Sequence, residues 1–324
     1  MKRTLILIIC LLAAIPSDAQ ERNRYGMKFM RTGDKYVVEK VDQIEKIVDL
    51  TRVPDLYVPY RYVADKIKSD DYKKCVTRKY VFKDYGDRQL ELEVDLPVSG
   101  KGPYPFVIYV HGGGWISGGL NGFANQSTYM ASNGIAGVRV TYTLVKDGGH
   151  FEMGIKEIDE AYAFIAGHAD EWGLDMSRFG FAGGSAGTPL SSYWAMRKEN
   201  CKLFIGFNGI YDFTSALPAG NFPGNNQYLR YIDTPEKRKA ISPIHAVPRK
   251  NPPAVLVAHG TADVTIRHHQ SIALCDTVEA NGGKACKLIY PYYVHSFFNR
   301  NVSDKYEEVT LAKLKFAEEI FGIE

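Results

Sequence analysis

The segment Gly183-Gly184-Ser185-Ala186-Gly187 has the pattern G-x-S-x-G, and an apolar run over 179–182 leads directly into it. In this pattern a buried strand turns sharply into a helix at the serine. Small residues are needed on both sides, because larger side chains would clash with the adjoining strand or helix. The turn presents the hydroxyl at the end of a sheet, so the pattern indicates Ser185 as a candidate nucleophile.

A second glycine-rich motif, His111-Gly112-Gly113-Gly114-Trp115, follows an apolar run over 106–110. Consecutive glycines leave backbone N–H groups uncovered, so that a substrate can approach them closely. Acyl transfer through a tetrahedral intermediate places negative charge on the former carbonyl oxygen, and losing one preorganised N–H donor typically costs about 3 kcal/mol of barrier. The order of this motif and Ser185 along the chain favours a shared site.

A serine hydroxyl needs a general base, and the base needs an orienting acid. Of the eight histidines, His295 is the candidate base, because it follows the last expected strand in a loop that can reach the sheet edge. His259 ends an earlier strand and is expected to support the turn after it. Asp263, shortly beyond that strand, is the candidate acid, and Asp276 is the alternative, within an expected helix. The order Ser, Asp, His excludes the chymotrypsin and subtilisin arrangements.

The elements that must position these residues alternate between strands and helices. Continuous apolar strands separated by helices predict a mostly parallel sheet covered on both faces, with ligands bound at the carboxyl ends of the strands. Two β-like runs joined by a turn over 84–87 predict a preceding antiparallel hairpin. Strands are expected over 75–82, 90–96, 106–110, 137–142, 179–182, 203–207, 254–258 and 287–290. Helices are expected over 35–49, 155–165, 271–280 and 309–321, among others.

The N-terminus has the pattern of an export signal. Two basic residues precede an apolar stretch over 5–15, and Ser17-Asp18-Ala19 supplies small residues for cleavage, so the mature chain is expected to begin at Gln20. The stretch is shorter than the roughly 20 residues needed to span a bilayer, which argues against stable membrane insertion. A membrane anchor or a lipid on Cys10 is the alternative. We expect a secreted or periplasmic protein.

Composition narrows the function classes. The chain has 324 residues, of which 45% are hydrophobic, as in a globular protein with a large core. Its net charge of +3 comes from interspersed charges without a basic block, which gives nucleic-acid binding no support. Beyond residue 19 the cysteines are Cys75, Cys201, Cys275 and Cys286. Cys275 with Cys286 is the candidate disulfide, and buried free thiols are the alternative. No His and Cys cluster has metal-ligand spacing, so no metal is expected.

Together, His-Gly-Gly-Gly-Trp at 111–115, Gly-x-Ser-Ala-Gly at 183–187, His-Gly-Thr-x-Asp at 259–263 and His-Ser-Phe at 295–297 resemble the α/β-hydrolase superfamily. Over residues 75–322 the chain is most similar to the hormone-sensitive-lipase-like esterases and to bacterial acetylxylan and feruloyl esterase-like proteins. The resemblance implies an α/β-hydrolase fold and a serine carboxylesterase that needs no cofactor.

The resemblance also implies roles. Ser185 would be the nucleophile, His295 the general base and then acid, and Asp263 its orienter. The N–H groups of Gly113, Gly114 and Ala186 would form the oxyanion hole. The chain departs from the family at two places: many members have a glycine where this chain has Thr188, and read Tyr-Arg-Leu where it has Tyr142-Thr143-Leu144. Both departures are near the expected site but outside the three catalytic residues, so they concern the substrate rather than the chemistry.

We expect a signal peptide over 1–19, an N-terminal extension over 20–74 that is a candidate cap, and one hydrolase domain over 75–324. Residues 213–250 interrupt the alternation of strands and helices and are a candidate lid or binding wall, or a plain surface excursion.

The expected substrates are small-molecule or polysaccharide-linked esters of short acyl groups, with acetyl or feruloyl esters of plant polysaccharide as the hypothesis. Aromatic residues expected near the mouth would stack on sugar or phenolic rings, or pack in the core: Trp115, Tyr211, Phe213 and Phe222. An exopeptidase of the prolyl-oligopeptidase type and a non-catalytic binding protein are the alternatives, because one fold hosts many functions. The oligomeric state stays open.

Overall fold

The computed structural model describes residues 67, 69–215, 227–291, 293–300 and 305–323, and the backbone of three N-terminal strands. These strands, β1 (Gln20–Arg22), β2 (Met27–Thr32) and β3 (Lys35–Lys40), form an antiparallel sheet. The helix expected over 35–49 is therefore wrong at 35–40, and 41–49 lie outside the described residues. Aromatic and β-branched residues favour a strand here, and Gly-Asp between β2 and β3 is a hairpin dipeptide. The expected signal peptide also lies outside the described residues.

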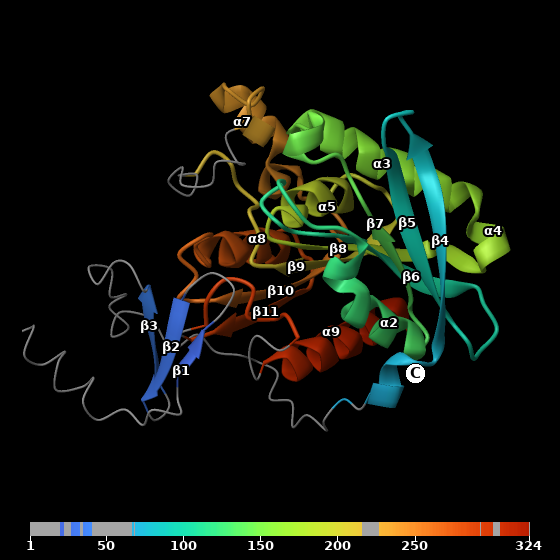
Figure 1. The fold of residues 1–324 in the computed structure, drawn as a ribbon, viewed down its shortest axis with the longest axis horizontal. Coiled ribbons are helices and arrows are strands. Elements are labelled where there is room, and N and C mark those ends of the chain that lie inside the picture. Colours follow the sequence, from blue (N-terminus) through green and yellow to red (C-terminus); the bar gives the residue numbers. More distant parts are fainter. Residues whose placement is uncertain are drawn as a thin grey trace, which may run out of the picture.

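The central sheet has eight strands in the order β11-β10-β9-β8-β6-β7-β5-β4 (Figure 1). They are β4 (Cys75–Asp84), β5 (Gln89–Pro97), β6 (Tyr104–Val110), β7 (Ala136–Val140), β8 (Leu174–Gly184), β9 (Cys201–Phe207), β10 (Ala254–Gly260) and β11 (Ala285–Tyr290). The six strands β6 to β11 pair in parallel with their neighbours among these six. Strand β5 pairs antiparallel with both β7 and β4. The expected fold class, a mostly parallel sheet after an antiparallel hairpin, is confirmed.

Helices cover both faces of this sheet. The helices are α2 (Ala124–Ser132), α3 (Phe151–Gly167), α4 (Ala169–Trp172), α5 (Gly187–Ala195), α7 (Pro235–Ile241), α8 (His269–Ala280) and α9 (Tyr306–Phe321). Short 3-10 turns occur at η3 (Ser69–Tyr72), η4 (Leu120–Phe123), η5 (Val145–Asp147) and η6 (Pro243–Ala246). Helices α3, α4, α5 and α8 lie on one face of the sheet, and α2 and α9 lie on the other (Figure 1). Their buried side chains form two separate cores, one on each face.

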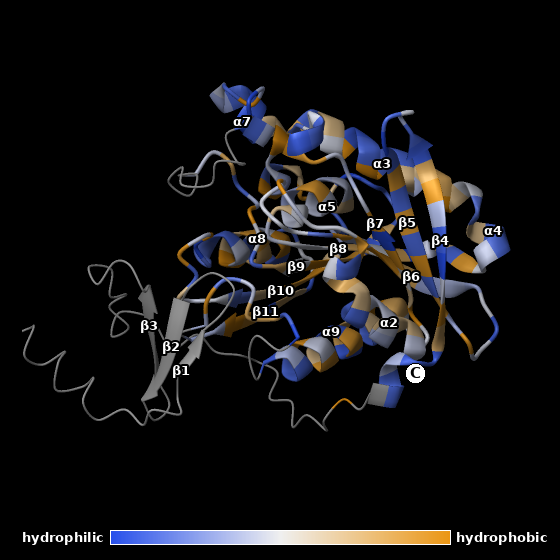
Figure 2. Ribbon diagram, in the orientation of Figure 1, coloured by the Kyte–Doolittle hydropathy of each residue, from blue (hydrophilic) through white to orange (hydrophobic). Residues whose placement is uncertain are grey.

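Apolar strands lie between these two layers of helices (Figure 2). Successive side chains of a strand point to opposite faces, so on β6 Phe106 and Ile108 enter one core while Val107 and Tyr109 enter the other. Among the described residues, none of the helices combines the length and the apolar character that crossing a membrane requires.

The four cysteines beyond residue 19 are free thiols, so the candidate disulfide between Cys275 and Cys286 does not form. The reason is their position on opposite faces of the sheet. Cys275 on α8 packs in the core under α3, α5 and α8, whereas Cys286 on β11 points into the core under α9. The alternative reading, free thiols, matches the structure.

Helix α2 begins beside the candidate site, and buried polar contacts fix it to the sheet. Ser127 donates to the carboxylate of Asp95 on β5, and Arg139 on β7 binds the same carboxylate through two N–H groups, each at 2.9 Å. On the other side of α2, the ammonium of Lys313 on α9 donates to the backbone and side-chain oxygens of Gln126 at 3.2 and 3.3 Å.

Lys313 is fully buried, and its burial holds the pKa of its ammonium group well below the usual range. The unfolded chain binds this proton up to about pH 10.4, whereas the folded chain releases it at lower pH. Because the unfolded state then binds more protons, this group makes stability rise with pH across that interval.

We therefore expect Lys313→Met to raise the free energy of unfolding at pH 7, because the methionine side chain has no charge that burial would desolvate. The gain should shrink between pH 7 and 10, as denaturant unfolding at several pH values would show. Lys315→Met is the matched control, because Lys315 is on the same helix but half exposed. A gain that stays constant with pH would contradict this account.

Candidate active site

Ser185 lies at the sharp turn between β8 and α5. Its backbone φ of +51° is in the left-handed region, which residues other than glycine rarely adopt. Its N–H donates to the carbonyl of Phe207 at the end of β9 at 2.8 Å. The glycine at 183 is required, because a Cβ there would lie 2.3 Å from the Ser191 hydroxyl and 2.6 Å from the Gly187 carbonyl. The turn therefore needs the small neighbours that the sequence pattern supplies.

Thr188, which replaces the glycine of many related chains, stabilises this turn. Its buried hydroxyl donates to the Ser185 carbonyl at 2.5 Å and accepts from the N–H of Ile210 at 3.2 Å. The Thr188 hydroxyl, which a glycine would lack, therefore connects the turn at Ser185 to the segment after β9.

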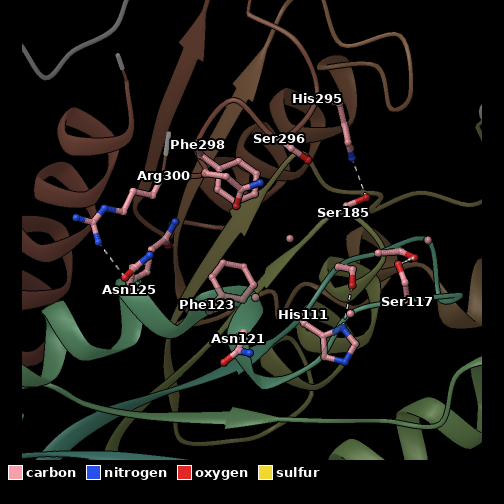
Figure 3. Close-up of a pocket in the computed structure, with 18 of the residues that line it drawn as sticks. His111, Ser117, Asn121, Phe123, Asn125, Ser185, His295, Ser296, Phe298 and Arg300 are labelled. Atoms are coloured by element: carbon pink, nitrogen blue, oxygen red, sulfur yellow. Dashed lines mark hydrogen bonds between the residues drawn. The ribbon is translucent and has the colours of Figure 1, made fainter. Parts of the chain in front are cut away.

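The side chains of Ser185, His295 and Asp263 form one hydrogen-bonded chain, of which Figure 3 shows the bond between His295 and Ser185. His295 Nε2 is 2.9 Å from Ser185 Oγ, and His295 Nδ1 is 2.7 Å from Asp263 Oδ2. The three residues follow β8, β10 and β11, whose carboxyl ends meet at one edge of the parallel sheet. Asp276, the alternative acid, is on α8 and pairs with Lys287 instead. The structure thus brings together the three residues that the sequence singled out.

The carboxylate of Asp263 accepts four hydrogen bonds. Oδ1 accepts from the N–H groups of Thr265 and Ile266 at 2.8 and 2.9 Å, and Oδ2 lies 2.7 Å from His295 and 3.1 Å from His259. Burial by itself would raise the pKa of Asp263, but His295 and the hydrogen bonds from both histidines hold that pKa well below its usual range. His259 therefore supports the turn, as expected, and also contacts the candidate acid.

Two unusual backbone conformations orient the loop that carries His295. Ser296 and Asn208 both have left-handed φ, of +66° and +50°. With its amide oriented so that both atoms are paired, Asn208 donates to the Ala258 carbonyl at 3.2 Å and accepts from the Ser296 N–H at 2.5 Å. Sequence reasoning missed Asn208, whose position directly after β9 at the same sheet edge was the only available signal.

The triple-glycine loop approaches Ser185 closely. A Cβ at Gly112 would lie 2.6 Å from the carbonyl of Gly184, and Gly113 and Gly114 have φ of +116° and +64°. His111 stacks on Tyr142, and burial lowers the pKa of its imidazole to about 4, so it is neutral at pH 7. The loop therefore places uncharged groups and bare backbone beside the serine.

Two cavities of unequal size meet at Ser185. The large cavity has a volume of about 650 Å³ and includes Gly113, Gly114, Ser185 and His295 in its lining (Figure 3). The small cavity has a volume of about 20 Å³, and its walls are Gly114, Trp115, Ser185, Ala186, Ile210, Thr265 and Ile266. Gly114 thus borders both cavities, and Ala186 borders the small one. Within the described ranges, no group of three or more His, Cys, Asp and Glu side chains is arranged to hold a metal ion.

The four aromatic residues expected to contact substrate have different outcomes. Trp115 is buried but forms a wall of the small cavity. Tyr211 and Phe213 form no wall of either cavity, and are fully buried in the core against Phe204 and Phe151, so the structure uses them for packing. Phe222 lies outside the described residues.

Two aromatic residues that sequence reasoning missed, Phe123 and Phe298, line the large cavity. Phe298 follows His295 by three positions, so its place in the sequence could have indicated that it lines the site. Phe123 is far from the three catalytic residues in the sequence, and only the fold brings it there. The described part of the expected lid contributes Tyr228, whose ring stacks on Trp115 with centroids 5.1 Å apart. Tyr228 therefore packs against a wall residue of the small cavity without lining that cavity itself.

We expect Asp263→Asn to lower kcat/KM for an ester by about 10³–10⁴-fold, because an amide cannot accept N–H bonds at both terminal atoms and orients His295 wrongly. In the wild type, kcat/KM should fall as the pH drops from 8 to 5, because a protonated imidazole cannot accept the serine proton. Asp263 stays ionised over this range, because its pKa lies below it.

The stability of the fold depends on pH differently from the activity. The depressed pKa of Asp263 stabilises the fold above about pH 4, and this contribution is lost only as the pH falls further, through the folded-state pKa. Circular dichroism should therefore stay constant between pH 5 and 8 while kcat/KM falls. A flat rate profile would argue against His295 as the base.

Comparisons with known proteins extend beyond the site. The BD-FAE family (bifunctional feruloyl/acetyl xylan esterase) matches residues 92–278, more than half of the chain. Relatives include two probable isoprenylcysteine alpha-carbonyl methylesterases, from Oryza sativa subsp. japonica and Arabidopsis thaliana, each 24% identical over 65% of this chain. The chain spans 56% and 50% of their lengths.

Among solved structures, a thermophilic esterase of Thermogutta terrifontis has a TM-score of 0.65 and 23% identity, over 78% of this chain and 94% of its own. An arylesterase has a TM-score of 0.63 and 20% identity, over 76% of this chain and 85% of its own. These similarities show the esterase α/β-hydrolase fold. The matched family model covers the glycine loop, the serine turn and Asp263, and on this evidence the chain belongs to the BD-FAE family.

Proposed function

We propose that this protein is a serine ester hydrolase that removes short acyl groups, acetyl above all, from a bulky alcohol. The observation that carries the chemistry is the hydrogen-bonded chain from Ser185 through His295 to Asp263, beside the glycine loop. This arrangement provides a nucleophile, a general base with an orienting carboxylate, and backbone donors close to the reacting atoms.

In the proposed reaction, Ser185 Oγ attacks the ester carbonyl carbon while His295 Nε2 accepts its proton. The charge on the carbonyl oxygen is stabilised by N–H groups of Gly113, Gly114 and Ala186. The intermediate then collapses, the bond to the alcohol oxygen breaks, and His295 returns the proton to that oxygen. His295 then deprotonates a water molecule, which attacks the acyl-enzyme. The bond between the acyl carbon and Ser185 Oγ breaks, His295 gives its proton to Oγ, and the acid is released.

The two cavities assign the two arms of the ester. The alcohol oxygen must lie near His295, which protonates it, and His295 lines the large cavity but not the small one. The alcohol therefore belongs in the large cavity. The acyl arm then extends into the small cavity beside Gly114 and Ala186, where about 20 Å³ accommodates one water-sized group such as a methyl. This geometry supports acetyl over feruloyl as the acyl group.

We further propose that the alcohol is a hydroxyl of plant polysaccharide. The family, the volume of the large cavity, and the amide side chains of Asn121, Asn125 and Gln126 in its wall support a polar, bulky alcohol. The export signal expected over 1–19 would place the protein where such polymers are found.

Paraoxon provides a direct test of the nucleophile, because it phosphorylates the Thermogutta terrifontis esterase 2. We expect it to inactivate the wild type and to add a diethyl phosphoryl group to Ser185, as peptide mass spectrometry would show. Ser185→Ala should escape modification and lose about six orders of magnitude in kcat. Ser177→Ala, at the opposite end of the same strand, should be modified like the wild type. Modification of Ser185→Ala at equal rate would refute the proposal.

The size of the small cavity predicts acyl selectivity. The wild type should prefer p-nitrophenyl acetate over the butyrate by about tenfold or more in kcat/KM, because one misfitting methylene costs about 1–3 kcal/mol. Ile210→Val should lower the ratio of kcat/KM for the acetate to that for the butyrate, since it removes a methyl group from the cavity wall and leaves more room for the acyl chain. Ile205→Val is the matched control, buried under the opposite face of the sheet. A wild type that prefers the butyrate would contradict the assignment of the acyl arm.

A further inference from the structure

The large cavity has a one-sided charge. Among the described residues that form its wall, Arg300 is the one arginine or lysine, and none is Asp or Glu. The other polar groups of this wall are amides, hydroxyls and the imidazoles of His295 and of His111, which is neutral at pH 7. Arg300 therefore favours an anion at this wall, with no carboxylate among the described wall residues to oppose it.

Arg300 has no carboxylate partner among the described residues, unlike Arg88, Arg139 and Arg178, which each pair with an aspartate. Its Nη1 donates to Asn125 Oδ1 at a long 3.4 Å, and its guanidinium lies 5.3 Å from the ring centre of Tyr72. Arg300 is exposed, and these two contacts leave most of its five N–H donors free.

The position of Arg300 relates it to the alcohol arm. It is five residues after His295, and both residues line the cavity. In Figure 3, Arg300 and Asn125 are at the far side of the cavity from Ser185 and His295, and the rings of Phe123 and Phe298 lie between them. Phe123 and Phe298 are nearly parallel, with ring centres 6.5 Å apart, so an alcohol whose oxygen lies at His295 extends past these rings along the cavity toward the guanidinium.

We propose that Arg300 and Asn125 form a carboxylate subsite, so that the preferred substrates are acetyl esters of alcohols that carry a carboxylate. Arginine binds a carboxylate through two parallel N–H bonds, which a neutral amide cannot replace. A uronic acid unit of a polysaccharide and an aromatic hydroxy acid both supply this chemistry. This inference deepens the proposed esterase function and rests on it.

The experiment compares 4-acetoxycinnamate with its neutral amide, and an O-acetylated methyl glucuronoside with the corresponding glucoside. Release of acetate gives kcat/KM for each member at 0.15 M NaCl. We expect the wild type to favour the charged member of a pair by about tenfold, and the pair that shows the larger preference identifies the source of the carboxylate. Because the two leaving groups differ in reactivity, the ratio is compared between variants, where that difference cancels.

Arg300→Gln should bring the ratio of charged to neutral substrate down about tenfold, mainly through a higher KM for the charged member. Arg300→Lys should retain part of the preference, because it keeps the charge but not the fork. Arg249→Gln is the matched control, since it removes one exposed arginine outside the cavity and should leave the ratio unchanged. In 1 M NaCl the wild-type preference should weaken through screening.

Equal rates within both pairs, or a wild-type ratio that survives in Arg300→Gln, would overturn the carboxylate subsite while the esterase function stands. If the wild type hydrolyses neither member, the esterase function itself fails. Binding of 4-acetoxycinnamate and its amide to Ser185→Ala, with and without Arg300→Gln, then decides the subsite independently of catalysis. Equal affinities in that measurement would overturn it.

Discussion

The left-handed backbone at Ser185 is the constraint on which the rest of the site depends. Such a conformation costs about 1–3 kcal/mol at a residue with a side chain, so the surrounding structure must enforce it. The N–H bond to Phe207 and the hydroxyl of Thr188 do so on one side. On the other side, the glycine loop lies so close that a Cβ at Gly112 would reach the Gly184 carbonyl at 2.6 Å. The serine is thereby fixed between two strands and a helix.

Burial of the carboxylate of Asp263 is the second requirement. An isolated buried carboxylate is costly, and here four donors compensate it: two backbone N–H groups and two imidazoles. The same bonds fix the direction of the acid, and through it the ring of His295. His259 is buried between Asp263 and the hydroxyl of Ser271 on α8, so the orientation of the acid depends on a helix that contributes nothing else to the site.

The fold places the reacting groups, but the cavities distinguish substrates, because one fold serves many activities. The small cavity is closed by Trp115, which packs on Tyr228 from the long segment after β9. The segment from His295 to Arg300 forms part of the wall of the large cavity, so the loop that supplies the base also supplies the one arginine among the described wall residues. The proposed acyl and alcohol preferences thus depend on residues outside the sequence motifs, Ile210 at the small cavity and Arg300 at the large one.

The sequence by itself determined the order of the eight strands from β4 to β11, the helices α3, α5, α8 and α9, and the three residues of the hydrogen-bonded chain, but it did not predict α2, α4 or α7. Apolar periodicity reports burial, and a strained turn or a bare backbone demands glycine at particular positions. It misassigned 35–40 as helix, and expected Tyr211 and Phe213 at the substrate, because aromatic side chains look alike whether they line a cavity or fill a core. Only the tertiary structure decided which of them face Ser185, and that Asn208 and Arg300 lie at this edge of the sheet. Their positions depend on contacts between segments far apart in the chain, which local patterns do not encode.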